Sequence, residues 1–243
     1  MPTVEWNRKT WGDEHGWAEE GDEWAGMAKA CGQPYDAWKH ALIDALVLPY
    51  VDTEADALEI APGHGRWSAT LVATCRSVTL VDLNPECIAT CRRRFADRPN
   101  VTYHVNDGRT LPNDDGAVDF VWSFDSFVHM DLDVIAGYLG EIARVLRPGG
   151  IAVLHHANKR DFPPSLRATS GRLGAAGLAV QRLATQGRVR DTGNRSDVSA
   201  RLVADAADLK VLLQVDRWGP GGRFTVGKYR DAITVVGPPD RRQ

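Results

Sequence analysis

Short apolar runs alternate with stretches of helical spacing through most of the chain. An apolar run bounded by turn residues is typical of a buried strand, whereas apolar residues that recur every three or four positions are typical of a helix. The alternation favours an α/β fold with a doubly wound, mostly parallel sheet. The predicted strands lie at residues 58–62, 77–82, 101–105, within 117–130, and at 151–156, 209–218 and 231–237; the predicted helices lie at 35–50, 67–73, 85–96, 133–146 and 196–207.

The stretch Leu58–Ser68, LEIAPGHGRWS, joins the first predicted strand to the helix after it. Gly63 and Gly65 lack a Cβ, so the backbone can take a positive φ there and a bound molecule can approach the main chain closely. Two spaced glycines also fit an ordinary strand-to-helix turn. Glu59 lies inside the apolar strand, where a carboxylate needs a partner such as the amides of the turn or a cation of a ligand. We therefore expect a ligand at this turn.

Asp82 ends the second predicted strand, 23 residues after Glu59. A doubly wound sheet places at this point the carboxylate that binds ribose hydroxyls. Asn84 and Pro85 follow and are typical of a helix start, so a helix-capping role for Asp82 is the alternative.

Four motifs in a fixed order resemble those of class I S-adenosylmethionine-dependent methyltransferases, over about residues 56–237. They are Glu59-x-Ala61-x-Gly63-x-Gly65, Asp82, Asn106-Asp107-Gly108 and the turn Leu146-Arg147-Pro148-Gly149-Gly150. The resemblance implies S-adenosylmethionine as the cofactor and a seven-stranded, Rossmann-like sheet, mostly parallel with an antiparallel last strand. One departure is Ala61, where the family usually has glycine.

The resemblance also implies which residues bind the cofactor. Asp107 would accept from the adenine amino group, although an acid before glycine also fits an Asx-turn. The implied cofactor-binding residues are Glu59, Ala61, Gly63, Gly65, Asp82, Leu83, Asp107, Gly108 and Ser123.

Three histidines lie at the carboxyl ends of the fourth and fifth predicted strands, which meet at the edge where ligands bind. They are His129, His155 and His156. Methyl transfer to a hydroxyl needs a base for the proton, and histidine suits that role near neutral pH. Asp125 would orient an imidazole or accept from a substrate hydroxyl. Adjacent residues of a strand face opposite ways, so we expect one of His155 and His156 to face substrate and the other to pack; each histidine alone also fits a structural role.

The acceptor is predicted to be a sugar or polysaccharide hydroxyl. The sequence FVHM at residues 127–130 is similar to the loop after strand four in sugar and natural-product O-methyltransferases. The chain also resembles polysaccharide-modifying enzymes such as methylmannose-polysaccharide O-methyltransferases. The alternatives are an amino sugar or small natural product methylated on nitrogen, a nicotinamide-dependent oxidoreductase, and a non-catalytic scaffold that binds the cofactor. Asp125, His129, Asp131 and Asp133 include ligands that Mg²⁺ takes, but Asp131 and Asp133 also sit where helix-capping acids belong, so no metal is assigned.

The predicted methyltransferase-like domain of residues 51–243 has an N-terminal extension and one long insertion. Residues 1–50 form an arm and a helix expected to cover the cleft, with Trp6, Trp11, Trp17, Trp24 and Trp38 to bury. Packing without ligand contact is the alternative. Residues 157–195 carry eight bases and two acids, so 8 − 2 gives +6, and this long connection is expected to be a lid. A solvated loop is the alternative.

Composition limits the partners. The chain has 243 residues, a net charge of −3 and four cysteines, and no CxxC pair. This balance gives no overall attraction to nucleic acid or to anionic membranes, and the sequence shows no signal pattern and no long apolar run. We therefore expect a cytoplasmic protein with a small-molecule or oligosaccharide acceptor, without nucleic-acid or membrane partners; the oligomeric state, a homodimer included, stays open.

Overall fold

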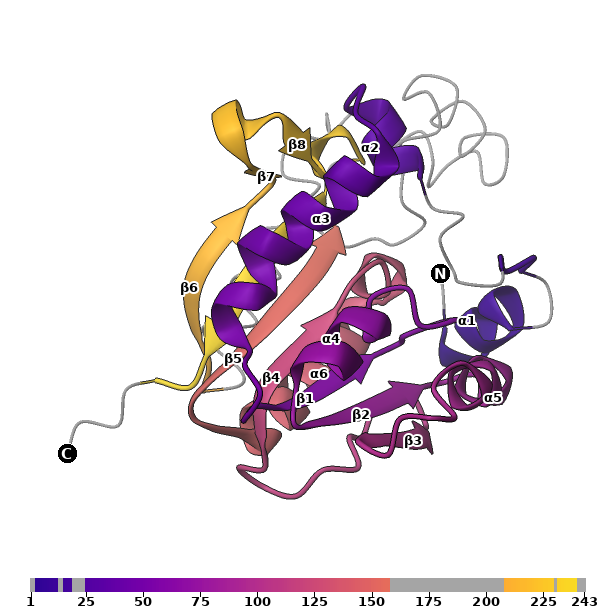
Figure 1. The fold of residues 1–243 in the computed structure, drawn as a ribbon. Helices are drawn as coiled ribbons and strands as arrows, with labels where there is room; N and C mark the ends of the chain where they lie inside the picture. The colour runs from indigo at the N-terminus through magenta and orange to yellow at the C-terminus, as the bar shows by residue number, and fades with distance from the viewer. Residues whose placement is uncertain (1–2, 13–14, 19–24, 158–207, 230, 240–243) are drawn as a thin grey trace, which may run out of the picture.

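The structure is a computed structural model that describes residues 3–12, 15–18, 25–157, 208–229 and 231–239. Its centre is a seven-stranded sheet in the order β3-β2-β1-β4-β5-β9-β6 (Figure 1). Neighbouring strands from β3 to β5 run parallel, whereas β9 pairs antiparallel with both β5 and β6. The predicted fold class is therefore confirmed.

The elements follow one another in βα order in the first half of the chain. The strands are β1 Asp56–Ile60, β2 Ser77–Asp82, β3 Val101–Val105, β4 Val118–Ser123, β5 Leu146–Ala157, β6 Lys210–Val215, β7 Arg217–Trp218, β8 Phe224–Thr225 and β9 Asp231–Gly237. The helices are α1 Val4–Trp11, α2 Gly26–Ala30, α3 Tyr35–Leu46, α4 Ser68–Thr74, α5 Pro85–Arg94 and α6 Leu132–Val145, with 3₁₀ turns η1 Leu48–Tyr50, η2 Phe127–His129, η3 Pro220–Gly222 and η4 Gly227–Tyr229.

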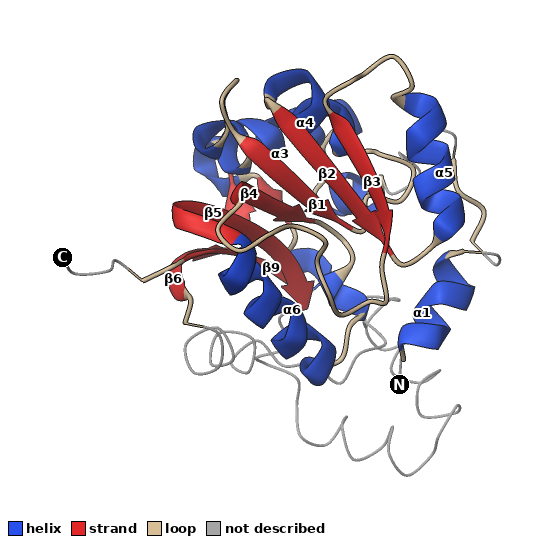
Figure 2. Ribbon diagram, turned by 90° about the horizontal axis from the view of Figure 1, so that it is seen from below, coloured by secondary structure: helices blue, strands red, loops and turns tan. Residues whose placement is uncertain are grey.

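Helices cover both faces of the sheet, as Figure 2 shows, with α3, α4 and α5 on one face and α6 on the other. Two clusters of buried apolar side chains lie between these layers. The first includes Trp38 of α3 and Leu71 of α4, and the second includes Leu139 and Ile142 of α6. The strands that lie between them are apolar on both sides because both faces are covered.

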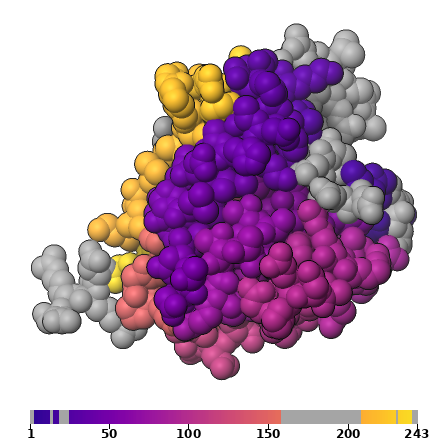
Figure 3. All heavy atoms as spheres, viewed as in Figure 1, coloured from indigo at the N-terminus to yellow at the C-terminus, as the bar shows by residue number. Residues whose placement is uncertain are grey.

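An aromatic cluster ties α3 to the carboxyl ends of β1 and β4. The Trp38 ring lies 5.8 Å from that of Phe124 and 5.4 Å from that of Trp218, and the Trp67 ring lies 5.0 Å from that of Phe124. In the space-filling view, α2 and α3 form a continuous surface beside the yellow C-terminal segment (Figure 3). The helix predicted at 35–50 is observed as α3, which ends at Leu46, followed by the 3₁₀ turn η1 at Leu48–Tyr50.

The turn Arg147–Gly150 differs from the prediction. The predicted helix runs to residue 146, but α6 ends at Val145, and Leu146 is already extended and paired with Val118 of β4. Pro148 disfavours the helical conformation of Arg147, and the pairing of Leu146 with Val118 takes the chain into β5 one residue earlier. Gly149 takes a positive φ of 84° inside the long strand β5.

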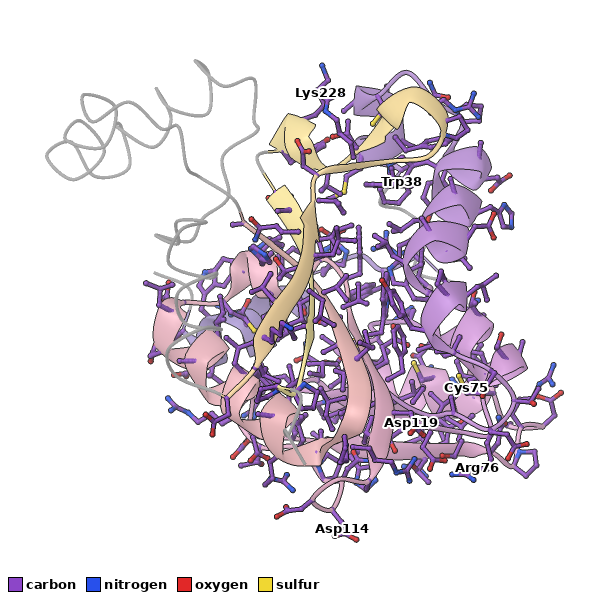
Figure 4. The ribbon with its side chains drawn as sticks, turned by 90° about the vertical axis from the view of Figure 1, so that its left-hand side faces the viewer. Trp38, Cys75, Arg76, Asp114, Asp119 and Lys228 are labelled. Carbon is purple, nitrogen blue, oxygen red and sulfur yellow. The ribbon has the colours of Figure 1, made fainter. Side chains whose placement is uncertain are left out.

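The amino ends of β1 and β4 carry an ion-pair network. Arg147 Nη2 donates to Asp56 Oδ2 at 2.8 Å, Arg147 Nη1 donates to Asp119, and Arg76 donates to both oxygens of Asp56. The backbone N–H of Asp56 donates to Asp119 Oδ2 at 2.9 Å. Figure 4 shows Asp119 and Arg76 near each other at this end, with Trp38 toward the other.

Among the described residues, no helix is long and apolar enough to cross a membrane.

Candidate active site

A cavity lies beyond the carboxyl ends of β1, β2 and β4, where an open α/β sheet binds ligands. Its walls come from the glycine turn, the ends of β2 and β4, α6 and the N-terminal arm. Seven predicted site residues line the cavity: Ala61, Gly63, Asp82, Leu83, Gly108, Asp125 and His129. The rest of the lining is formed by Val4, Asn7, Trp11, Trp17, Ile60, Pro62, Arg66, Trp67, Val81, Asn84, Cys87, Phe124, Ser126, Met130, Val134 and Tyr138.

The glycine turn is made of residues in the left-handed region. Gly63 has φ 57° and Gly65 has φ 86°, and Ala61 has φ 59° although it carries a Cβ. A left-handed alanine costs about 1 kcal/mol or more, so the departure from the family's glycine leaves strain at this turn. A Cβ on Gly65 would lie 3.0 Å from the Phe95 ring. Gly65 therefore serves close packing against α5, and it does not line the cavity.

Helix α5 holds the turn from below. The Cys91 thiol donates to the Gly63 carbonyl at 3.2 Å, and Arg94 Nη1 donates to the His64 carbonyl at 2.8 Å. Both bonds link the last two turns of α5 to the glycine turn. The described cysteines are free thiols, with Cys75, Cys87 and Cys91 buried.

Glu59 is buried within β1, 1% exposed, and behind the cavity lining. Its Oε2 accepts from the Ser68 hydroxyl at 2.5 Å. Turn amides or a ligand cation were expected as its partner, so the Ser68 hydroxyl corrects that expectation. Burial raises the pKa of Glu59 to about 7, against the lowering effect of Ser68 and of nearby Arg66.

Asp82 lines the cavity and is 5% exposed. Its Oδ2 accepts from the Gly63 N–H at 3.2 Å and its Oδ1 from the Asn84 N–H at 2.8 Å. Burial raises its pKa to about 6, although those backbone donors lower it. The carboxylate thus joins the glycine turn to the start of α5, and it remains part of the cavity wall.

Asp107 and Ser123 lie beside the cavity, outside its lining. Asp107 is exposed, and its Oδ1 accepts from the N–H groups of Arg109 and Thr110, both at 2.8 Å. These bonds lower its pKa, with the Thr110 N–H as the largest cause. This is the turn geometry that the sequence offered as the alternative. Ser123 Oγ donates to the Ile60 carbonyl at 2.9 Å and joins the ends of β4 and β1.

The N-terminal arm reaches the cavity directly. Figure 2 shows α1 beyond the ends of β2 and β3. Trp17 stacks on His64 with ring centroids 5.1 Å apart, and a Cβ on Gly63 would lie 2.7 Å from the Trp17 ring. Trp17 Nε1 donates to the Trp11 carbonyl at 2.7 Å. The tryptophans therefore divide: Trp11 and Trp17 line the cavity, Trp38 is core, and Trp6 is 37% exposed.

His129 is the histidine that lines the cavity. It ends η2, and its backbone carbonyl accepts from Asn7 Nδ2 at 3.1 Å. The Trp11 ring lies 4.5 Å from the imidazole. Two residues of α1 therefore fix this histidine at the end of β4.

His155 is fully buried beneath the loop that carries Asp125. The Asp125 N–H donates to His155 Nδ1 at 3.1 Å, so the proton of a neutral ring lies on Nε2, which is 3.3 Å from Asp231 Oδ2. Phe124 stacks on this ring with centroids 4.2 Å apart. Asp125 takes a positive φ of 67° above it. This placement corrects the expectation of a histidine at the rim, because Phe124 lies against the ring.

His156 is buried between β5 and β9. Its Nδ1 donates to the Ala157 carbonyl at 3.1 Å, and its Nε2 accepts from the Thr234 hydroxyl at 2.7 Å. Burial lowers its pKa to about 4. Both nitrogens are satisfied in the neutral ring, and neither this histidine nor His155 is part of the described cavity wall.

Several lining residues were not predicted as site residues. Arg66 and Trp67 follow the second glycine of the turn directly, so their position in the motif was the available signal. Asn7 and Trp11 come from a separate helix, α1, and no fixed spacing relates them to the motif residues. Among the described residues, no group of three or more His, Cys, Asp or Glu side chains could hold a metal ion.

Comparisons with known proteins agree with this geometry. A family model described as a methyltransferase domain matches residues 57–150. A fatty-acid O-methyltransferase of Mycolicibacterium smegmatis is 31% identical over 170 residues, which cover 68% of this chain and 60% of that protein. A phthiotriol/phenolphthiotriol dimycocerosates methyltransferase of Mycobacterium ulcerans is 27% identical over 188 residues, 71% of this chain and 65% of that protein. The matched part is thus less than two thirds of either relative.

Solved structures share the fold. Geranyl diphosphate C-methyltransferase from Streptomyces coelicolor, solved with Mg²⁺, geranyl diphosphate and S-adenosyl-L-homocysteine, has a TM-score of 0.64 at 17% identity and covers 97% of each chain. The N-methyltransferase NodS from Bradyrhizobium japonicum has a TM-score of 0.55 at 14% identity, over 84% of this chain and 86% of that one. The domain match and the shared fold agree with the class I resemblance.

Proposed function

We propose, from the class I methyltransferase domain that this chain carries, that it transfers a methyl group from S-adenosylmethionine to an oxygen of a small-molecule acceptor, with His129 as general base. The family match at residues 57–150 supports the reaction class. The observation on which the proposal depends is that one cavity has both Asp82 and His129 in its wall.

The lining fits a nucleoside with an amino-acid tail. Asp82 is buried there, and its carboxylate suits the two hydroxyls of a ribose. Leu83 and the Cβ-free Gly108 suit the flat face of a purine, and Ala61 and Gly63 offer main-chain groups to the tail. When bound, S-adenosylmethionine supplies an electrophilic methyl carbon. The work of these residues is to hold it close to the acceptor and aligned with it.

His129 suits the role of base. A neutral imidazole accepts the proton of an attacking hydroxyl, which contributes about 10²–10⁴-fold in rate. The Trp11 ring against the imidazole and the Asn7 bond to its carbonyl limit its movement. Because Asn7 and Trp11 belong to α1, the described part of the predicted arm at 1–50 acts in this proposal as a cover that completes the site of the predicted domain at 51–243. The predicted lid at 157–195 lies outside the described residues from 158 onward.

The acceptor's class is the finer part of the proposal. The sequence predicts a sugar or polysaccharide hydroxyl. The cavity supports an acceptor with an apolar part as a second candidate, because Val4, Met130 and Val134 are in its wall. The relative named for fatty acids and the one named for phthiotriol dimycocerosates are consistent with that second candidate.

Cofactor binding is tested first by calorimetric titration with S-adenosylhomocysteine and, separately, with NAD. We expect binding of the former; binding of NAD alone would make the proposal wrong. Because hydroxyl donors favour the ionised carboxylate and the pKa of Asp82 is about 6, affinity should fall about tenfold from pH 7 to pH 5. Asp82→Asn should weaken binding and remove this pH dependence.

Turnover is tested next with matched acceptors. A panel of oligosaccharides, long-chain alcohols and the corresponding amines, with and without Mg²⁺, is followed by mass spectrometry of the products. Products methylated on oxygen support the proposal. Reaction of the oligosaccharides indicates a sugar acceptor, and reaction of the long-chain alcohols indicates an apolar one. Methylated amines alone would replace the oxygen acceptor with nitrogen.

A further inference from the structure

Arg66 places a buried cation in the cavity wall. It comes directly after the glycine turn and is 6% exposed. Its guanidinium carbon lies 4.9 Å from the Trp67 ring centroid and 5.8 Å from that of Phe124. Two aromatic rings therefore hold the planar group in place while it faces the cavity.

The hydrogen bonding of this guanidinium is incomplete. Arg66 Nη2 donates to Asp125 Oδ2 at 3.3 Å, and within the described part of the chain that carboxylate is its one hydrogen-bond acceptor. An arginine has five N–H donors in a fixed fork. A buried cation with one long hydrogen bond has lost most of its hydration without full replacement. A further acceptor in the cavity would complete it.

Asp125 is itself fixed in position. Its N–H donates to the buried His155 ring, and that ring lies 3.3 Å from Asp231 Oδ2. Its backbone has a positive φ of 67°, which few residues tolerate. The Arg66 fork is thus bonded on one side to a carboxylate whose backbone is held in place, and its other donors are available to a ligand.

We propose that Arg66 binds a carboxylate of a ligand in this cavity. Guanidinium and carboxylate match as a planar, two-point pair. The inference rests on the proposed function, and under it the carboxylate has two sources. One is the amino-acid end of the cofactor, and the other is an acceptor with an acid group.

The cofactor source is tested by comparing S-adenosylhomocysteine with 5′-methylthioadenosine, which lacks the amino-acid carboxylate. Calorimetry gives both affinities for the wild type, Arg66→Met and Arg66→Lys. We expect Arg66→Met to weaken the first ligand by about 30-fold or more and to leave the second unchanged. Arg66→Lys should recover part of the loss, because it keeps the charge without the fork. Arg93→Gln, an exposed arginine of α5 whose Nη2 donates to the Thr90 hydroxyl, is the matched control and should change neither affinity.

The acceptor source is tested with decanoate against methyl decanoate on the same variants. A loss for decanoate alone in Arg66→Met places the acceptor's acid group at Arg66. Unchanged affinity for both S-adenosylhomocysteine and decanoate in Arg66→Met overturns the proposal, and so does an equal loss of S-adenosylhomocysteine and 5′-methylthioadenosine in Arg66→Lys. Failure of the wild type to bind either nucleoside would instead overturn the proposed function, while the decanoate comparison would still decide on Arg66.

Discussion

Strand β1 carries one carboxyl group near each end, and the pKa values of the two are shifted in opposite directions. Asp56 at the amino end is paired with Arg76 and Arg147, and the hydrogen bond from Arg76 is the largest cause that holds its pKa well below the usual range. Glu59, three residues on, has a serine hydroxyl as its hydrogen-bond partner, and burial raises its pKa to about 7. Cations therefore favour the ionised form of Asp56 at one end, and burial favours the protonated form of Glu59 at the other.

The difference separates stability from binding within one sheet. At the amino end, Asp56 and Asp119 pair with Arg76 and Arg147 near the surface, so these charges stabilise one another. At the carboxyl end, the described residues bond no cation to the buried Asp82 and give Arg66 a single long hydrogen bond. Groups whose pKa burial has shifted are typical of functional sites. Variants at the two ends should therefore change different measurements.

The largest expected effect is at His129. His129→Gln removes the proposed base and keeps a polar side chain of similar size, so kcat on a hydroxyl acceptor should fall by about 10²–10⁴-fold. The midpoint of unfolding and the affinity for S-adenosylhomocysteine should stay close to those of the wild type. His156→Gln is the control, since it changes a buried histidine outside the cavity and should lower stability before turnover. Unchanged kcat in His129→Gln contradicts the base, and is the result expected if the acceptor oxygen is a carboxylate that is already ionised.

The next effect is the pH dependence caused by Glu59. Its folded pKa of about 7 lies above the usual value of 4.5, so the folded state holds the proton more tightly. The contribution of the protonated group to stability is complete below pH 4.5 and is lost as pH rises through 7. Wild type should lose about 2–3 kcal/mol relative to Glu59→Gln between pH 5 and pH 8. Urea unfolding at four pH values measures this; a constant difference between the two proteins would show that Glu59 is ionised throughout.

A smaller effect is expected from the amino-end network. Arg147→Met removes hydrogen bonds to Asp56 and Asp119, and because Arg147 is 34% exposed, solvent screening limits the loss to about 1 kcal/mol. Affinity for S-adenosylhomocysteine should not change. The pKa of Asp56 is depressed, so its contribution is present above the usual Asp pKa and is lost in acid. Salt should reduce the difference between variant and wild type. A loss of ligand affinity would break the separation of the two ends.

The sequence predicted one side of this comparison better than the other. Strand and helix positions follow local apolar patterns, so β2, β3 and β9 were predicted at their observed bounds. The motif also placed Asp82 and Gly63 at the cavity. Neither His155 nor His156 lines the described cavity, because Phe124 and β9, which come from elsewhere in the chain, pack against them. Side chains that meet by tertiary packing, such as Asn7 and His129, have no local pattern that predicts their contact.

The smallest effect tests strain at the carboxyl end. Ala61 and Asp125 have positive φ at the strand ends beside the cavity. Gly149, which has no Cβ, takes a positive φ near the amino end of β5, at the opposite end of the sheet. Ala61→Gly relieves about 1–2 kcal/mol of strain and adds about 0.4–1 kcal/mol of unfolded-chain entropy, so we expect a net gain of about 0.5–1 kcal/mol by urea unfolding. Ala57→Gly, on the same strand in extended backbone, is the control and should lose stability. If Ala61→Gly gains stability and loses affinity for S-adenosylhomocysteine, the strained turn is held in the shape that binding needs; if it loses stability, the alanine Cβ packs well enough to outweigh its strain.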